Sequence, residues 1–196
     1  MENKVLIGVK RYNEKELDWV KEILEKYSPS KVGLGLPKDH LEREMYGVNT
    51  ALLSDLASHL KEKGVDIVPL EHPKLLDYFH ALDYAKAVID GKIKKEELEA
   101  NVKMTEKREK AYMAPEVLYP IMHFLERDKT ALKILAGNQT SEGVQNLWED
   151  SINDRQAYIL GRIMVSDVDV VVVPDVFTES IKLSLPDFEY VESPIE

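Results

Sequence analysis

The sequence predicts an α/β protein with a mainly parallel sheet, flanking helices and a mostly helical insertion. Short apolar segments of strand length occur near both ends of the chain. Amphipathic helical patterns separate the first three of these segments, as in parallel crossovers. Between about residues 75 and 148 the patterns are helical, and no segment has the convincing pattern of a strand. We therefore interpret residues 1–196 as a single α/β domain with a helical insertion at about 75–148.

Four segments have the pattern of buried strands, and they are residues 4–9, 31–36, 65–70 and 168–173. The last reads VDVVVV, a β-branched and almost continuous apolar run that is typical of a strand buried on both faces. Because the links to the intervening helices are short, we expect the four strands to be parallel members of one sheet.

The first helix has a clear start signal. Asn13 is a good N-cap, and Glu16 three residues later completes a capping box. The Ser28–Pro29 pair ends this helix. The second helix begins at Asn49 or Thr50 and ends before Gly64, which suits the left-handed position after a helix.

The insertion contains one strongly charged stretch, residues 92–110. We interpret it as a solvated helix, and the alternative is a projecting arm used for self-association. Residues 118–125 are more apolar and are expected to pack on the body. Residues 133–136 fit either a strand or a helix end. Thr140 or Ser141 then begins a helix that runs to Met164.

Composition excludes several classes of protein. The chain has no cysteine, which excludes disulfide scaffolds, cysteine nucleophiles and thiolate metal sites. A formal net charge of -10 repels phosphate backbones, so we expect no nucleic-acid partner. No apolar run has the length of a signal peptide core or a membrane span. We expect a cytoplasmic protein with no membrane partner, and the Lys- and Glu-rich composition favours a thermophilic source.

Ligands of parallel α/β sheets bind beyond the carboxyl ends of the strands. The candidate binding residues there are Arg11, Lys38, His40, Glu71, His72, Arg155 and Asp175. Their chemistry suits a small anionic ligand, and each is also typical of a solvated loop or helix cap. Three further histidines, His59, His80 and His123, are interpreted as structural or surface residues. Gly33 and Gly35 lack the third glycine of a dinucleotide site and are interpreted as positions of close packing.

Five segments carry a resemblance to a known group of proteins. They are residues 5–11, 32–36, 65–72, 155–163 and 168–173, and the best local match is Arg155-Gln-Ala-Tyr158. Their order resembles the TraB (pheromone-shutdown) family and the wider group that includes heme-binding ChaN and erythromycin esterase. The resemblance implies a histidine after the first and last strands, a glutamate on the second, and an arginine and a tyrosine on a late helix.

The chain departs from that pattern at three positions. Arg11 stands where the resemblance implies the first histidine, and Gly35 stands where it implies the glutamate. The last strand is followed by Asp175 without a histidine. Arginine stays protonated and does not bind metals, so we expect no bound metal and no cofactor.

These departures lead to three functional hypotheses. The first is a non-catalytic or diverged TraB-like protein that acts by binding, with homo-oligomer formation as a further expectation. The second is a hydrolase-type enzyme with a rebuilt site at the carboxyl ends of the strands. The third is a small-anion sensor that uses Arg11 and Arg155.

Arg155 provides a direct test of where these residues lie. It falls at or beside the apolar stripe of Ile152 and Ile159 on the late helix. An unpaired charge there is costly, so Arg155 should have a carboxylate partner. The candidates are Glu71 and Asp175, and Arg11 should lie close by.

Overall fold

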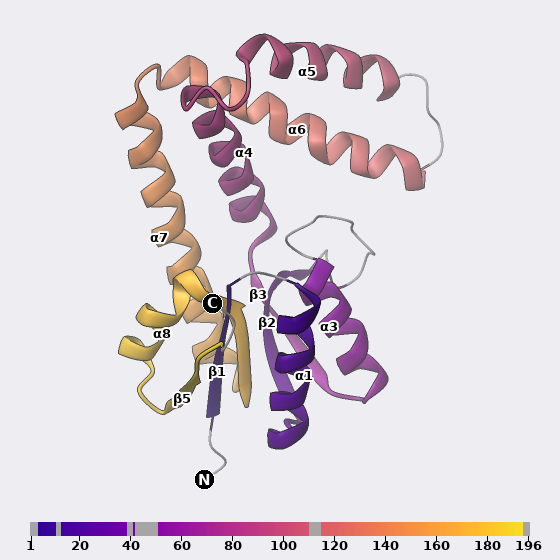
Figure 1. Ribbon diagram of the computed structural model, residues 1–196, viewed down its shortest axis with the longest axis vertical. Helices are drawn as coiled ribbons and strands as arrows, with labels where there is room; N and C mark the ends of the chain where they lie inside the picture. Colours follow the sequence, from indigo (N-terminus) through magenta and orange to yellow (C-terminus); the bar gives the residue numbers. More distant parts are fainter. Residues whose placement is uncertain (1–3, 11–12, 39–40, 42–50, 110–114, 194–196) are drawn as a thin grey trace. The chain divides into compact units, whose positions relative to one another are not determined.

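The computed structural model describes residues 4–10, 13–38, 41, 51–109 and 115–193 (Figure 1). A five-stranded sheet has the order β3-β2-β4-β1-β5. Its strands are β1 (Lys4–Val9), β2 (Lys31–Pro37), β3 (Asp66–Glu71), β4 (Val170–Pro174) and β5 (Phe188–Val191). Every neighbouring pair is parallel. The predicted α/β fold with a mainly parallel sheet is confirmed.

The chain forms two compact units. The first, called here the sheet unit, contains Met1–Pro73 and Arg155–Glu196, and the second, the helical unit, is Lys74–Asp154. The bounds of the helical unit are close to the predicted insertion at about 75–148. The prediction that the whole chain is one domain stays a prediction.

One face of the sheet is covered by α1 (Glu14–Tyr27) and α3 (Ala51–Glu62) (Figure 1). The core on this face contains alternate residues of the strands and the apolar stripes of both helices, including Ile7, Leu34 and Val172, which are 0% exposed. The other face receives the last part of α7 (Ser141–Ser166) and α8 (Thr178–Ser184). Burial on both faces explains the nearly continuous apolar strands.

The predicted start and end of the first helix are confirmed. Asn13 has an extended backbone, and its side-chain oxygen accepts a hydrogen bond from the Glu16 N–H at 3.0 Å. Ser28 adopts the left-handed conformation at the other end. The Glu16 carboxylate is fully buried and accepts a hydrogen bond from the Lys10 N–H, which joins the start of α1 to the end of β1.

An aspartate interrupts the apolar run before β4 for a structural reason. One oxygen of Asp169 accepts hydrogen bonds from the Ser30 N–H, the Ser30 hydroxyl and the Lys31 N–H, at 2.8 to 2.9 Å. These bonds fix the amino-terminal end of β2 beside β4. A carboxylate in this position therefore satisfies backbone N–H groups that would otherwise need another acceptor at this end of the sheet.

The carboxyl-terminal elements extend the predicted fold. Beyond β4 the chain forms a short 3-10 helix, η1 (Asp175–Phe177), then α8 and the edge strand β5. None of these three elements was predicted. In the case of β5, the strand has only four residues, and their burial is intermediate to exposed. Such a strand lacks the apolar run that indicates a buried one.

The helical unit contains α4 (Pro73–Ile89), α5 (Lys95–Glu109), α6 (Pro115–Gly137) and the first part of α7. Its described residues include no strand, and residues 133–136 belong to α6. Thr140 caps α7, because its hydroxyl accepts a hydrogen bond from the Gly143 N–H. The unit has its own apolar core, which includes Ala81, Leu82 and Ala131 at 0% exposure.

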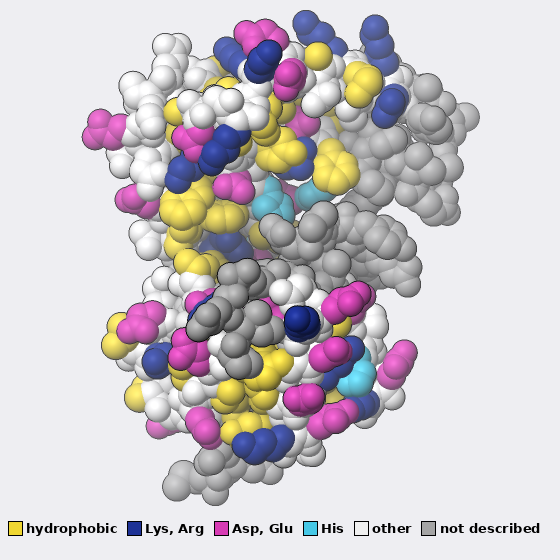
Figure 2. All heavy atoms as spheres, viewed as in Figure 1, with side chains coloured by type: hydrophobic (Ala, Val, Ile, Leu, Met, Phe, Trp, Pro, Cys, Tyr) yellow, Lys and Arg dark blue, Asp and Glu magenta, His cyan; other side chains and the backbone are white. Residues whose placement is uncertain are grey.

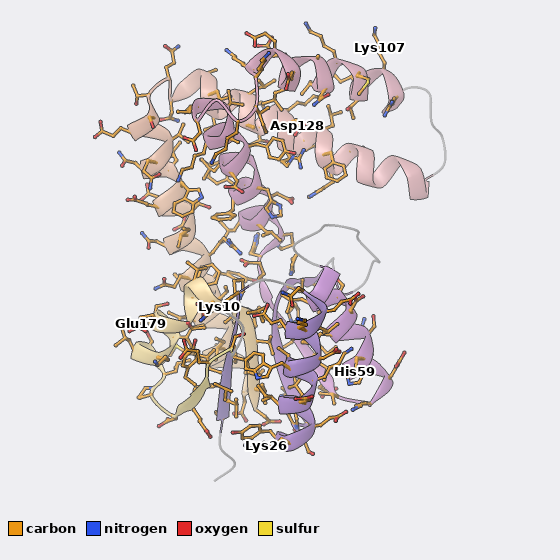
Figure 3. All side chains as sticks on the ribbon, in the orientation of Figure 1. Lys10, Lys26, His59, Lys107, Asp128 and Glu179 are labelled. Carbon is orange, nitrogen blue, oxygen red and sulfur yellow. The ribbon has the colours of Figure 1, made fainter. Side chains whose placement is uncertain are left out.

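Within the charged segment predicted at 92–110, residues 95–109 form α5. Leu98, which is 1% exposed, attaches this helix to the core of the helical unit. Lys107 extends from α5 into solvent (Figure 3). Carboxylates are interspersed with lysines and arginines on the visible face of the described residues (Figure 2). No helix among the described residues is long and apolar enough to cross a membrane. Self-association through α5 stays a prediction.

The N-cap of α1 can be tested by substitution. Asn13→Ala should lower the free energy of unfolding by about 1 kcal/mol, because it leaves the Glu16 N–H without its acceptor. Reversible denaturant unfolding measures this. Asn101→Ala is the matched control, since Asn101 is exposed within α5 and alanine favours helix. Equal effects of the two substitutions would contradict the assignment.

Candidate functional site

The carboxyl end of β3 holds a buried ion pair. Glu71 is the last residue of the strand, and Arg155 lies on α7. The Arg155 Nη2 and Nε atoms lie 2.7 and 3.1 Å from the same carboxylate oxygen, Glu71 Oε2. The two side chains are 6% and 0% exposed, respectively. The predicted carboxylate partner of Arg155 is therefore confirmed as Glu71.

The guanidinium of Arg155 is also held by an aromatic ring. Its central carbon lies 4.9 Å from the centroid of the Phe177 ring, and Phe177 is fully buried. Stacking of this kind fixes the plane of an arginine side chain and suits its weakly hydrated charge. Glu71 and Phe177 thus hold Arg155 from two sides.

Two further contacts join α7 to the edge strand β3 and to the residue that follows this strand. The rings of His72 and Tyr158 meet edge to face, with centroids 5.1 Å apart. Arg162 Nε donates to the carbonyl of Pro69 at 3.3 Å. Together with the Arg155–Glu71 pair, these contacts use residues three and seven positions apart on α7, which lie on one face of the helix. We name these three contacts the insertion clasp.

The insertion clasp lies where the chain leaves and re-enters the sheet unit. Glu71 comes just before the helical unit begins at Lys74, and Arg155 is the first residue after it ends at Asp154. The ion pair joins residues 84 positions apart. Closing a chain segment of this length costs conformational entropy, which such contacts must offset.

Burial decides the energetic character of the pair. Removing two charges from water costs several kcal/mol per ion, so a buried pair adds little net stability over an apolar one. Removing only one partner leaves an uncompensated charge and is strongly destabilising. The Arg155–Glu71 pair therefore constrains which residues are tolerated at both positions.

One atom of the pair has unused hydrogen-bonding capacity. Glu71 Oε1 is buried, and no described residue donates a hydrogen bond to it. Buried acceptors are usually satisfied, and an exception calls for an explanation such as strain, catalysis or an ordered water. This oxygen could accept a hydrogen bond from a water or a ligand.

Asp175 belongs to a separate cluster after β4. The Tyr190 hydroxyl donates to Asp175 Oδ1 at 3.0 Å, and the Thr178 hydroxyl lies 3.3 Å from the same oxygen. Burial raises the pKa of Tyr190, and its hydrogen bond to the Asp175 carboxylate raises this pKa further. A Cβ atom at Gly8 would collide with the Asp175 carboxylate. The cluster thus connects β1, η1 and β5.

The packing of the sheet requires a glycine at position 35, where the resemblance implies a glutamate. A Cβ atom at this position would lie 2.9 Å from the ring of Pro174 and 3.3 Å from the Val173 Cα atom. Neither atom belongs to a flexible side-chain end, so a larger residue would need the strands to move. The glutamate that the resemblance implies does not fit at Gly35 in this sheet.

The remaining candidate residues are only partly placed. Lys38 follows β2 and is exposed. Arg11 and His40 lie outside the described residues, so the expected proximity of Arg11 to Arg155 also lies outside them. Among the residues described, no group of three or more histidine, aspartate or glutamate side chains could hold a metal ion.

Sequence reasoning missed parts of the site. Phe177 gave no signal, because it falls in a short 3-10 helix that no periodicity indicates. Arg162 could have been found, since Arg155, Tyr158 and Arg162 share one face of a helix. His72 is among the predicted candidates and directly follows Glu71 in the sequence. The strand ends at Glu71, and both side chains contact α7.

The sheet and these contacts define an α/β protein with a parallel sheet and a helical insertion. No protein-family model matches the chain, and no curated protein is significantly similar to it. Among solved structures, it is similar to a mutant of the erythromycin esterase EreC in its open conformation. The two are 11% identical, the match covers 97% of this chain and 70% of that one, and the TM-score is 0.43. The similarity is too distant to show a family or to support an argument about activity.

The energetic role of the pair predicts a specific mutational pattern. Arg155→Met should lower the free energy of unfolding by about 3–5 kcal/mol, because Glu71 is left buried and uncompensated. Adding Glu71→Leu should recover most of this loss. Arg162→Met is the matched control on the same helix face and should cost about 1 kcal/mol. A double variant as unstable as Arg155→Met alone would contradict the pairing.

The Asp175 cluster predicts a dependence on alkaline pH. The folded-state pKa of Tyr190 is raised above the ordinary value of 10.0, so the folded state holds this proton more tightly. Its contribution to stability is fully present below the unfolded pKa and is lost as pH rises through the folded pKa. Denaturant unfolding over this range should show a fall in stability that Tyr190→Phe reduces. Identical pH profiles for the two proteins would contradict the prediction.

Proposed function

We propose that this chain is a non-catalytic or diverged TraB-like protein that acts by binding. The supporting observation is the Arg155–Glu71 pair, in which two donors of the guanidinium point at one carboxylate oxygen away from solvent. Both residues are among the candidates at the carboxyl ends of the strands. Each one satisfies the charge of the other, so their chemistry is used to hold the chain together.

The substitution at Gly35 supports the same proposal. Catalysis by acid and base groups needs a titratable side chain within reach of the reacting atoms. Position 35 has room for no side chain, since Pro174 and Val173 occupy the space. A sheet that packs in this way retains the architecture without the glutamate that the resemblance implies.

The pair also weakens the hypothesis of a small-anion sensor. That hypothesis needs surplus positive charge from Arg155, and the Glu71 carboxylate neutralises this charge at 2.7 Å. An anion bound beside Arg155 would also meet the negative Glu71. A sensor at this end of the sheet would therefore depend on Arg11, outside the described residues.

One observation favours the hydrolase-type alternative. Glu71 Oε1 receives no hydrogen bond from any described residue, and His72 is the next residue in the chain. A carboxylate with an open acceptor beside an imidazole is an arrangement that can serve acid–base catalysis. This alternative requires a water or substrate to reach Oε1.

Two assays separate binding from catalysis. We expect wild-type protein to show no turnover of model esters, amides and phosphoesters above the level of Glu71→Gln, because Glu71 serves structure. In a thermal-shift screen of a metabolite library, we expect a saturable ligand that also stabilises the Glu71→Leu, Arg155→Met double variant. Turnover that is lost in a Glu71→Gln variant shown by circular dichroism to be folded would overturn the proposal, and so would loss of ligand binding in a folded double variant.

A further inference from the structure

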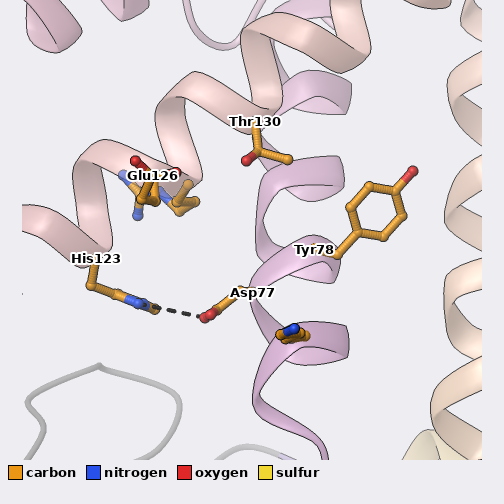
Figure 4. Close-up of a pocket in the computed structure, with 7 residues that line it drawn as sticks. Asp77, Tyr78, His123, Glu126 and Thr130 are labelled. Atoms are coloured by element: carbon orange, nitrogen blue, oxygen red, sulfur yellow. Dashed lines mark ion pairs between the residues drawn. The ribbon is translucent and has the colours of Figure 1, made fainter.

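A polar pocket lies within the helical unit, between α4 and α6. Its volume is about 360 Å³, within the range of roughly 300–1,000 Å³ of ligand-binding pockets. Residues of α4 and α6 contribute Lys74, Asp77, Tyr78, His123, Arg127 and Thr130 to its wall. Figure 4 shows Asp77 and His123 pointing toward one another across it. Their nearest ionisable atoms are 3.5 Å apart.

The polar lining is unusual for two neighbouring helices of one core. Further along the same faces, α4 and α6 contribute apolar residues to the core, among them Ala81, Ala85 and Ala131. Helix faces that pack together are normally apolar throughout. One turn away, each face becomes charged and a cavity replaces the contact. The two helices thus leave a polar cavity of a size that a small ligand can occupy.

Arg127 is held in a fixed position in the pocket wall. Its guanidinium carbon lies 3.7 Å from the centroid of the Tyr84 ring. Nε and Nη2 both donate to Asp128 Oδ1, at 2.9 and 2.7 Å. A guanidinium has five N–H donors in a rigid fork, so donors beyond these two remain. A pre-organised arginine loses little entropy when it binds a carboxylate.

The charges around the pocket are mixed. Lys74 supplies positive charge, and Asp77 and Glu126 supply negative charge. Asp128 balances the charge of Arg127, which contributes its remaining N–H donors. Carboxylates this close repel a ligand with several negative charges. The lining instead matches a ligand that has one anionic and one cationic group.

We propose that this pocket binds a small zwitterion of the amino-acid class. The ligand carboxylate is bound by Arg127 and Lys74, and its ammonium group by Asp77 and Glu126. Thr130 lines the same cavity, and its hydroxyl group can donate or accept a hydrogen bond. The inference gives a ligand class to the binding role proposed above and rests on that role.

The test uses the full chain and four variants matched in charge. Lys74→Met and Asp77→Asn change exposed residues of the pocket wall. Lys133→Met and Asp83→Asn make the same changes at exposed positions on α6 and α4 outside it. The probes are the standard L-amino acids one at a time, with acetate, methylamine and inorganic phosphate as controls. Thermal shift finds ligands, and titration calorimetry measures the Kd.

We expect at least one amino acid to stabilise the wild-type protein saturably and to bind more tightly than any control probe. Each pocket variant should raise its Kd by about tenfold or more, because a hydrogen bond to a charged group is lost. The two control variants should bind as the wild type does.

Three results would overturn this site. They are stabilisation by no amino acid, unchanged affinity in both pocket variants, and acetate or phosphate binding as tight as the best amino acid. If a metabolite binds wild-type protein and Lys74→Met with the same affinity, the pocket is not its binding site, but the proposed binding role of the protein still stands. Turnover that depends on Glu71 would instead contradict the proposed non-catalytic role, and this result would not bear on the pocket.

Discussion

The buried pair of Glu71 and Arg155 is the interaction on which the rest of the structure depends. The pair joins the last residue of the edge strand to the helix that returns from the insertion. Each residue needs the other, because either charge alone in this environment would cost several kcal/mol. The contacts of Tyr158 with His72 and of Arg162 with Pro69 continue along the same helix face. These contacts join the two chain segments of the sheet unit that precede and follow the insertion.

This constraint changes the meaning of the candidate residues at the carboxyl ends of the strands. Ligand sites of parallel sheets are usual there, and a cluster of charged residues in that region suggests chemistry. In this protein the described members of the cluster bind other parts of the chain: Arg155 binds Glu71, and Asp175 binds Tyr190. The same residue types therefore serve architecture, which is why fold and function must be argued separately.

The sequence predicted the fold well where the signals were local. Asn13, the Ser28–Pro29 pair and the VDVVVV run indicated element boundaries through capping, the backbone restriction before proline and burial on both faces. It missed β5, because a short edge strand needs little apolar surface. For the site, the cost of burying a charge predicted a carboxylate partner for Arg155 and left Glu71 and Asp175 as the candidates, of which the structure shows Glu71. Phe177 and the polar pocket did not follow, since both depend on contacts between distant segments.

Native-state hydrogen exchange tests the central claim most directly, because it reports the opening free energy of each segment. The experiment compares wild-type protein with Arg155→Met. If the insertion clasp holds β3 and α7 together, β3 and residues 155–166 should lose protection from exchange together in the variant. The protection of α1 should fall less. Wild-type protection in both segments of the variant would show that the Glu71–Arg155 pair does not hold this part of the structure.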